Sequence, residues 1–183
     1  LLPPQDWGFL GTIDRSKTSA KSDGWRHVTD RPEAFGGDAD RLAPAGGGEE
    51  FLVWEAPLLH EALVTLYAWG AGSNGSADAV GGGDAAERVK ARAILSVSAD
   101  GASWLEVPYE ARVAGGAAEG WLKVQLLPEL PDPAGIRYFR LTLAGAGSSG
   151  EAAGPEAAGS AQDPGPAIQV GHVSLRGWNP AGN

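Results

Sequence analysis

The sequence predicts an all-β protein, built as a two-sheet antiparallel β-sandwich of jelly-roll type. Two observations predict this fold class. Apolar residues recur with a period of two in several segments, which is the spacing of a strand with one buried face. Turns rich in glycine and proline separate these segments, and no stretch combines helical spacing with capping residues.

The first half of the chain opens irregularly and then continues as strands. Residues 1–40 carry scattered aromatic side chains, and we expect them to wrap over one end of the sandwich as loops and short strands. In residues 50–55 and 61–69, alternate side chains fall on opposite faces. Tyr67 and Trp69 therefore share the face turned away from the small apolar residues of their strand.

The second half continues the pattern of strands. Residues 89–97 are rich in alanine, but their apolar and polar residues alternate, which predicts a strand. Asp100-Gly101 predicts a tight hairpin turn, because both residue types tolerate a positive φ. Further strands are expected at residues 105–107, 122–126, 139–143 and 168–175.

The length of 183 residues predicts a single domain. We assign residues 1–178 to one β-sandwich module and residues 179–183 to the start of a linker. A glycine-rich loop at residues 70–86 and a low-complexity insertion at residues 144–167 interrupt the module, since both lack large apolar side chains. The chain has no methionine and no signal peptide, so we interpret it as a fragment of a larger protein.

Charge and composition exclude several classes of partner. The 14 basic and 23 acidic residues give a net charge of −9, which disfavours nucleic acid and anionic membrane surfaces. No apolar run approaches the roughly 20 residues of a membrane-spanning helix. The absence of cysteine excludes disulfides, thiolate metal sites and cysteine nucleophiles.

No enzyme signature is present in the sequence, which predicts a non-catalytic protein. The acidic residues form no motif that would pair two carboxylates across a cleft. The histidines, His27, His60 and His172, are scattered without metal-binding spacing. Neither a nucleophile elbow nor a glycine-rich phosphate loop occurs.

Three segments in order resemble discoidin-like modules of the galactose-binding-like β-sandwich superfamily. They are SADGASWLEV (98–107), RYFRL (137–141) and VGHVSL (170–175). In this resemblance Trp104 and Phe139 fill the core. Trp25, FGGDADR (35–41) and EFLVW (50–54) are also similar to the opening of β-sandwich modules attached to polysaccharide-degrading enzymes of soil bacilli.

The resemblance implies a bacterial glycan-binding module. It would be secreted to the extracellular space, bind a polysaccharide or oligosaccharide, and be linked covalently to a catalytic domain. Relatives often carry a structural calcium, and no other cofactor is expected.

One sheet face is the predicted sugar-binding surface. If Leu122, Val124 and Leu126 point inward, Trp121 and Lys123 point outward, and the same alternation turns Tyr138 and Arg140 away from the core. With Trp69, these side chains would present aromatic rings among polar groups. Two alternatives stand beside this prediction. Tryptophan commonly packs in cores, and the N-terminal wrap could cover this face. A third possibility is a cleft at the end of the sandwich, lined by Trp25 and Arg41.

Asp38 and Asp40 form a candidate metal site. Two carboxylates at this spacing, together with backbone carbonyls, suit a hard cation such as calcium. A solvated turn, or an Asp–Arg pair that fixes the loop, is the alternative.

Two hypotheses for function follow. The first is a carbohydrate-binding module that tethers an attached glycoside hydrolase or polysaccharide lyase to its polymer. The second is a structural β-sandwich spacer with no ligand of its own. An exposed aromatic face favours binding, whereas burial of every tryptophan favours a spacer.

Overall fold

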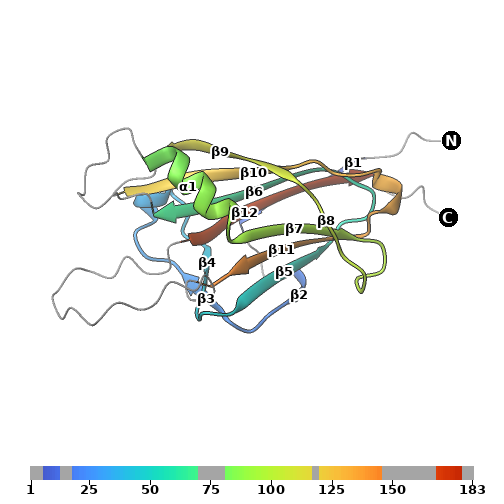
Figure 1. The fold of residues 1–183 in the computed structure, drawn as a ribbon, viewed down its shortest axis with the longest axis horizontal. Helices are drawn as coiled ribbons and strands as arrows, with labels where there is room; N and C mark the ends of the chain where they lie inside the picture. The colour runs from blue at the N-terminus through green and yellow to red at the C-terminus, as the bar shows by residue number, and fades with distance from the viewer. Residues whose placement is uncertain (1–5, 13–17, 70–80, 117–119, 146–167, 179–183) are drawn as a thin grey trace.

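Two antiparallel sheets pack face to face, which confirms the predicted β-sandwich (Figure 1). The structure is a computed structural model and describes residues 6–12, 18–69, 81–116, 120–145 and 168–178. The predicted linker at residues 179–183 lies outside these ranges, as do residues 70–80 of the predicted loop and residues 146–167 of the predicted insertion.

The larger sheet has seven strands, with β12 and β6 at its centre. Along the sheet the order is β3-β4-β12-β6-β10-β9, and β1 pairs with β12 on the side of β4. Its strands are β1 (Asp6–Thr12), β3 (Trp25–Val28), β4 (Arg41–Pro44), β6 (Leu59–Trp69), β9 (Tyr109–Gly116), β10 (Trp121–Pro128) and β12 (Ile168–Trp178).

The smaller sheet has five strands in the order β2-β5-β11-β7-β8. Its central strand, β11, pairs along its length with β5 on one side and β7 on the other. A 3₁₀ turn, η3 (Pro133–Gly135), precedes β11. The strands are β2 (Thr18–Lys21), β5 (Glu49–Glu55), β7 (Ala93–Ser98), β8 (Leu105–Glu106) and β11 (Tyr138–Ala144).

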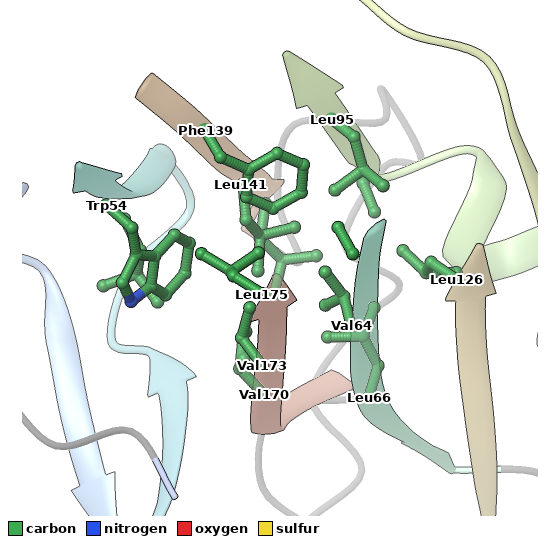
Figure 2. Packing of buried hydrophobic residues seen from close by; sticks show 14 of the residues in the cluster. Trp54, Val64, Leu66, Leu95, Leu126, Phe139, Leu141, Val170, Val173 and Leu175 are labelled. Carbon is green, nitrogen blue, oxygen red and sulfur yellow. The ribbon is translucent and has the colours of Figure 1, made fainter. Parts of the chain in front are cut away.

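The main core fills the space between the two sheets. Phe139, Leu141 and Leu143 alternate along β11 and have no exposed surface, as their period of two predicts. Figure 2 shows Phe139 and Leu141 of the smaller sheet directed toward Val64 and Val173 of the larger one. Each fully buried side chain of this kind contributes about 1.5–3 kcal/mol of stability.

A helix, α1 (Gly81–Lys90), replaces the start of the strand predicted at residues 89–97. The smaller sheet takes up this part of the chain only at Ala93, where β7 begins. The helix also includes residues 81–86 of the predicted glycine-rich loop. Ala85 and Val89 are fully buried, one helical turn apart. A separation of four residues fits both periods, so the alternation alone could not exclude a helix.

The N-terminal wrap contains more regular structure than the sequence predicts. It includes β1, β2 and β3, followed by a 3₁₀ turn, η1 (Pro32–Phe35), that precedes β4. The Trp25 indole N–H donates a hydrogen bond of 3.0 Å to the carbonyl of Phe51, so this side chain links β3 of the larger sheet to β5 of the smaller one. The N-terminal wrap therefore connects the two sheets through a side-chain hydrogen bond.

Candidate functional site

The predicted binding face is divided between the two sheets. Trp69, Trp121 and Lys123 lie on β6 and β10 of the larger sheet, where Trp121 pairs with Trp69. Tyr138 and Arg140 lie on β11 of the smaller sheet. Side chains that point away from the shared core on different sheets emerge on opposite sides of the sandwich. The prediction that all five residues form one surface is therefore wrong.

On the outer side of the larger sheet, Trp121 is covered rather than exposed. Its side chain is only 1% exposed, and its ring centroid lies 5.2 Å from that of Phe35 in η1 and 5.5 Å from that of Trp69. Tyr67 meets Phe35 edge to face at 5.0 Å. Phe35, Tyr67, Trp69 and Trp121 thus form a second, smaller core, which we term the outer aromatic cluster. The alternative that the N-terminal wrap covers this face is confirmed.

Arg41 fixes the covering segment in place. This side chain is fully buried, and its Nε donates 2.8 Å to Oε1 of Gln169 on β12. Its Nη atoms donate to the carbonyls of Asp38 and Asp30, and its guanidinium lies 3.7 Å from the centroid of the Phe35 ring. Burial lowers the pKa of Arg41, while the nearby carboxylates of Asp38 and Asp30 act in the opposite direction. The buried cation is therefore paired at each nitrogen and stacked on a ring.

Burial also shifts the pKa values of two further side chains on the larger sheet, Tyr67 and His172. The Tyr67 hydroxyl donates 3.0 Å to the carbonyl of Phe35, and desolvation, with Asp38 nearby, raises the pKa of Tyr67 to about 12. His172 lies 3.4 Å from the Thr65 hydroxyl, and burial lowers the pKa of this imidazole. Both groups are consequently neutral at pH 7, which suits their buried positions.

The candidate metal residues are engaged with protein groups. Asp38 Oδ1 accepts 3.2 Å from the backbone N–H of Asp40, and the Asp40 carboxylate contacts the imidazole of His27. Within the described ranges, no three acidic, histidine or cysteine side chains gather closely enough to hold a metal ion. The carboxylate that pairs with Arg41 is that of Asp30, at 3.5 Å. The structural calcium remains a prediction.

Trp25 is half-buried and packs against the main core. Because its indole N–H is already bonded to Phe51, the polar edge of this ring is occupied. Trp25 therefore stabilises the end of the sandwich, and the side chain of Arg41 is fully buried rather than exposed beside it.

The outer side of the smaller sheet brings Tyr138 and Arg140 together with a residue that the sequence did not assign to a site. Trp104 was expected in the core, but it is half-buried outside the main core, and its ring lies 4.2 Å from the Arg140 guanidinium carbon. Tyr138 and Arg140 are half-buried on the same face of β11, as their alternation predicts. The Asp-Gly turn indicated a hairpin before Trp104, but nothing in the local pattern indicated over which face that hairpin folds.

The hairpin loop that carries Trp104 is organised by two side chains. Asp100 Oδ1 accepts hydrogen bonds from the backbone of Ala102 and Ser103 at 2.8 and 2.7 Å, and Ser98 Oγ accepts from Gly101 at 2.8 Å. These backbone donors lower the pKa of Asp100 to about 2. Gly101 has φ of 76°, and a Cβ there would lie 3.4 Å from the Tyr138 ring. The loop is thus held over Tyr138.

Two buried polar atoms on this face lack hydrogen-bond partners within the described structure. They are Nε of Arg140 and Oγ of Ser96, and the two residues are opposite each other on β11 and β7. Ser96 in turn pairs with the exposed Glu106 of β8. We refer to Ser96, Trp104, Tyr138 and Arg140 as the Arg140 face.

A shallow pocket of about 350 Å³ lies at the edge of the smaller sheet next to the Arg140 face. Glu106 and Ile94 contribute to its lining, together with Lys90 from the end of α1 and Tyr109 from the start of β9. The Tyr109 hydroxyl donates 2.7 Å to the carbonyl of Ala93, and burial raises its pKa to about 12. The pocket extends the accessible surface beyond Glu106.

Comparisons with protein-family models, with curated proteins and with solved structures find no match to this chain. The site must therefore be interpreted from its own chemistry. The Arg140 face offers aromatic rings, a cation and the Tyr138 hydroxyl on a preorganised surface. None of the described helices has the length and apolar composition needed to cross a membrane.

Proposed function

We propose that the protein is a non-catalytic carbohydrate-binding module whose sugar-contacting surface is the Arg140 face. The observation that carries this proposal is the stacking of Trp104 on Arg140, beside Tyr138, on a sheet face held by an ordered hairpin loop. The proposal retains Tyr138 and Arg140 from the sequence prediction and adds Trp104.

The chemistry of this face matches that of a polyhydroxylated ligand. The C–H faces of a sugar ring stack on aromatic rings, and pairs of stacked aromatic rings gain about 0.5–1.5 kcal/mol beyond the area they bury. We take a similar scale for a sugar on Trp104 or Tyr138. The guanidinium of Arg140 and the Tyr138 hydroxyl supply hydrogen bonds to sugar hydroxyls.

The affinity of a single site of this kind is expected to be weak. A polysaccharide presents many copies of its repeating unit, so rebinding along the polymer compensates for weak single contacts. In this proposal the module belongs to a secreted, extracellular bacterial enzyme. It would hold a covalently linked glycoside hydrolase or polysaccharide lyase at its substrate.

A structural spacer is the second candidate, and the burial of tryptophan favours it. Trp54 and Trp121 are 3% and 1% exposed, and Trp25 is engaged in a structural hydrogen bond. Trp104 and Trp178 are the contrary observations, since Trp104 is half-buried and Trp178 is 37% exposed. A binding measurement separates the two candidates.

The test is affinity gel electrophoresis of the chain on a panel of soluble polysaccharides, comparing the parent with Trp104→Ala. We expect the parent to be retarded by at least one polymer, and Trp104→Ala to lose most of that retardation. Trp178→Ala is the matched control, because Trp178 lies on the larger sheet against His60. Circular dichroism of both variants checks that the fold is intact.

Two results would contradict the proposal. If no polysaccharide retards the parent, the protein is better explained as a spacer. If a folded Trp104→Ala variant is retarded as strongly as the parent, the sugar site lies elsewhere on the molecule.

A further inference from the structure

Arg140 on β11 has no compensating carboxylate among the described residues, and neither has the exposed Arg26 on β3. Arg112, Arg137 and Arg176 each lie within 4 Å of a carboxylate, those of Glu110, Glu55 and Glu61 respectively. No carboxylate of the described residues forms an ion pair with Arg140, and none of these residues accepts a hydrogen bond from it. Acidic residues outnumber basic ones by 23 to 14, so the lack of a partner does not reflect a shortage of acids.

The strand register explains why Arg140 has no acidic partner. Its neighbours across the sheet are Val53 on β5 and Ser96 on β7, and neither carries a charge. Thr142, two residues along the same face, is also uncharged. Arg137 lies near the Tyr138 ring, at 5.7 Å, but its charge is paired with Glu55. Arg140 is therefore the uncompensated positive charge of this face.

The surroundings of Arg140 are suited to an oxyanion. Trp104 stacks on the guanidinium and holds its plane, which leaves the edge of the group to form hydrogen bonds. A planar guanidinium presents N–H donors in a fork that fits the two oxygens of a carboxylate. Nε of Arg140 and Oγ of Ser96 belong to directly opposite residues and are buried without hydrogen-bond partners in the described structure, so a ligand reaches the guanidinium through its Nη atoms.

We propose that the Arg140 face binds an acidic polysaccharide, with the guanidinium of Arg140 contacting an oxyanion of the sugar and Trp104 or Tyr138 stacking on a ring. This inference rests on the proposed function and specifies its ligand class. The shared chemistry is an oxyanion borne by a sugar ring, and its source is either a uronic acid carboxylate or a sulfate ester.

Glu106 opposes such a ligand and so provides a second test of the inference. It is exposed and pairs with Ser96, which places it two strand spacings, about 10 Å, from Arg140 along the same row. This separation is close to the Debye length of about 8 Å at physiological ionic strength. Glu106 therefore repels a bound oxyanion weakly, and loss of its charge strengthens binding about two-fold.

The experiment compares polymers that differ only in charge. Polygalacturonate is tested against its methyl ester, and dextran sulfate against dextran, by affinity electrophoresis with the parent, Arg140→Gln, Arg140→Lys and Glu106→Gln. Arg112→Gln is the matched control, since it removes the same charge from an exposed position on β9. Neutral polysaccharides complete the panel.

We expect the parent to bind one acidic polymer at least ten-fold more tightly than its uncharged counterpart. Arg140→Gln abolishes this preference, Arg140→Lys retains part of it, and Arg112→Gln leaves it intact. Glu106→Gln raises affinity for the acidic polymer and leaves affinity for the uncharged one unchanged. The polymer pair that shows the preference identifies the oxyanion as carboxylate or sulfate.

Other outcomes overturn the inference and remain distinguishable from failure of the proposed function. If the parent binds neutral polysaccharides and shows no preference for charge, the module binds sugar but not through an oxyanion. If a folded Arg140→Gln variant still prefers the acidic polymer, another residue recognises the charge of that polymer. If Arg140→Gln does not fold, unchanged binding by Glu106→Gln contradicts the inference. Absence of binding to every polymer refutes the proposed function itself.

Discussion

Arg41 holds in place the segment that covers the outer face of the larger sheet. Its guanidinium bonds Gln169 of β12 and two carbonyls of the covering segment, and it stacks on Phe35. In the sequence, Arg41 follows two aspartates on a glycine-rich turn, which favoured a metal site or a loop ion pair. Its burial also depends on a contact with Gln169, 128 positions away, which local sequence cannot reveal.

We predict that Arg41→Met destabilises the protein by about 3–5 kcal/mol, because removal of one partner leaves buried acceptors without donors. Arg41→Lys should also destabilise it, since an ammonium cannot reproduce the planar fork or the stacking on Phe35. Urea unfolding of each variant measures the change. Arg26→Gln, an exposed change on the neighbouring strand β3, is the control and should alter stability by no more than about 0.5 kcal/mol. Equal stability of Arg41→Met and the parent would show that the contacts of the Arg41 guanidinium do not stabilise the fold.

At the scale of elements, the sequence predicted that the chain reverses between β7 and β8. It did not predict over which face of the sheet this hairpin lies. The Asp-Gly pair correctly indicated a reversal of the chain, because turn chemistry is local, but residues 99–104 form a longer loop in place of the tight turn. The same segment places Trp104 over Arg140, and this depends on how the hairpin twists across β11. Likewise, α1 escaped prediction because Ala85 and Val89 fit both a helical and an extended spacing, and packing against the sandwich selected the helix.

We predict that Asp100→Ala clearly lowers the affinity for polysaccharide and only slightly lowers the thermal stability of the protein. Loss of the carboxylate removes the acceptor for Ala102 and Ser103 and loosens the loop that positions Trp104. Affinity electrophoresis and thermal unfolding measure the two effects. Asp132→Ala is the matched control, because Asp132 accepts a hydrogen bond of 3.0 Å from Ala134 in an equivalent way at η3, which is not part of the hairpin. Reduced binding in both variants would mean that the effect is not specific to this loop.

The same carboxylate gives the hairpin a defined pH dependence. The pKa of Asp100 is lowered to about 2 in the folded protein from an ordinary value near 3.8. Its stabilising contribution is therefore present in full above pH 3.8 and is lost as the pH falls toward 2. In Asp100→Ala this part of the acid-induced loss of stability should disappear.

At the scale of the whole molecule, the two outer faces of the sandwich have different roles. The face of the larger sheet is occupied by the outer aromatic cluster, which is internal structure. The face of the smaller sheet carries Trp104 on Arg140. Because the main core separates the two faces, a change on one should have little effect on the other.

We predict that Trp121→Ala costs about 3–5 kcal/mol of stability, as expected for a buried tryptophan, while the folded fraction binds polysaccharide as the parent does. Trp104→Ala should show the reverse, with lost binding and a small change in stability. The double variant should then be additive in unfolding free energy within about 0.5 kcal/mol. A coupling clearly above this value would show that the two faces communicate through the core.

The sequence by itself determined the class of fold, the inward residues of the strands at residues 122–126 and 139–143, and the reversal of the chain at Asp100-Gly101. These features depend on the alternation of side chains along one strand and on the φ preferences of single residues, so they can be recognised from neighbouring positions alone. Phe139, Leu141, Leu143, Val124 and Leu126 all point into the core as that alternation predicts.

Only the tertiary structure decided which outward residues share a surface and which of them are covered. Trp121 and Arg140 both point away from the core, but alternation cannot specify which sheet a strand joins, because strand order arises from pairings between distant segments. The covering of Trp121 depends on Phe35 and the buried Arg41, and the placement of Trp104 depends on the fold of its hairpin over β11. Such long-range contacts are fixed by packing of the whole chain, which is why the candidate site emerged from the structure.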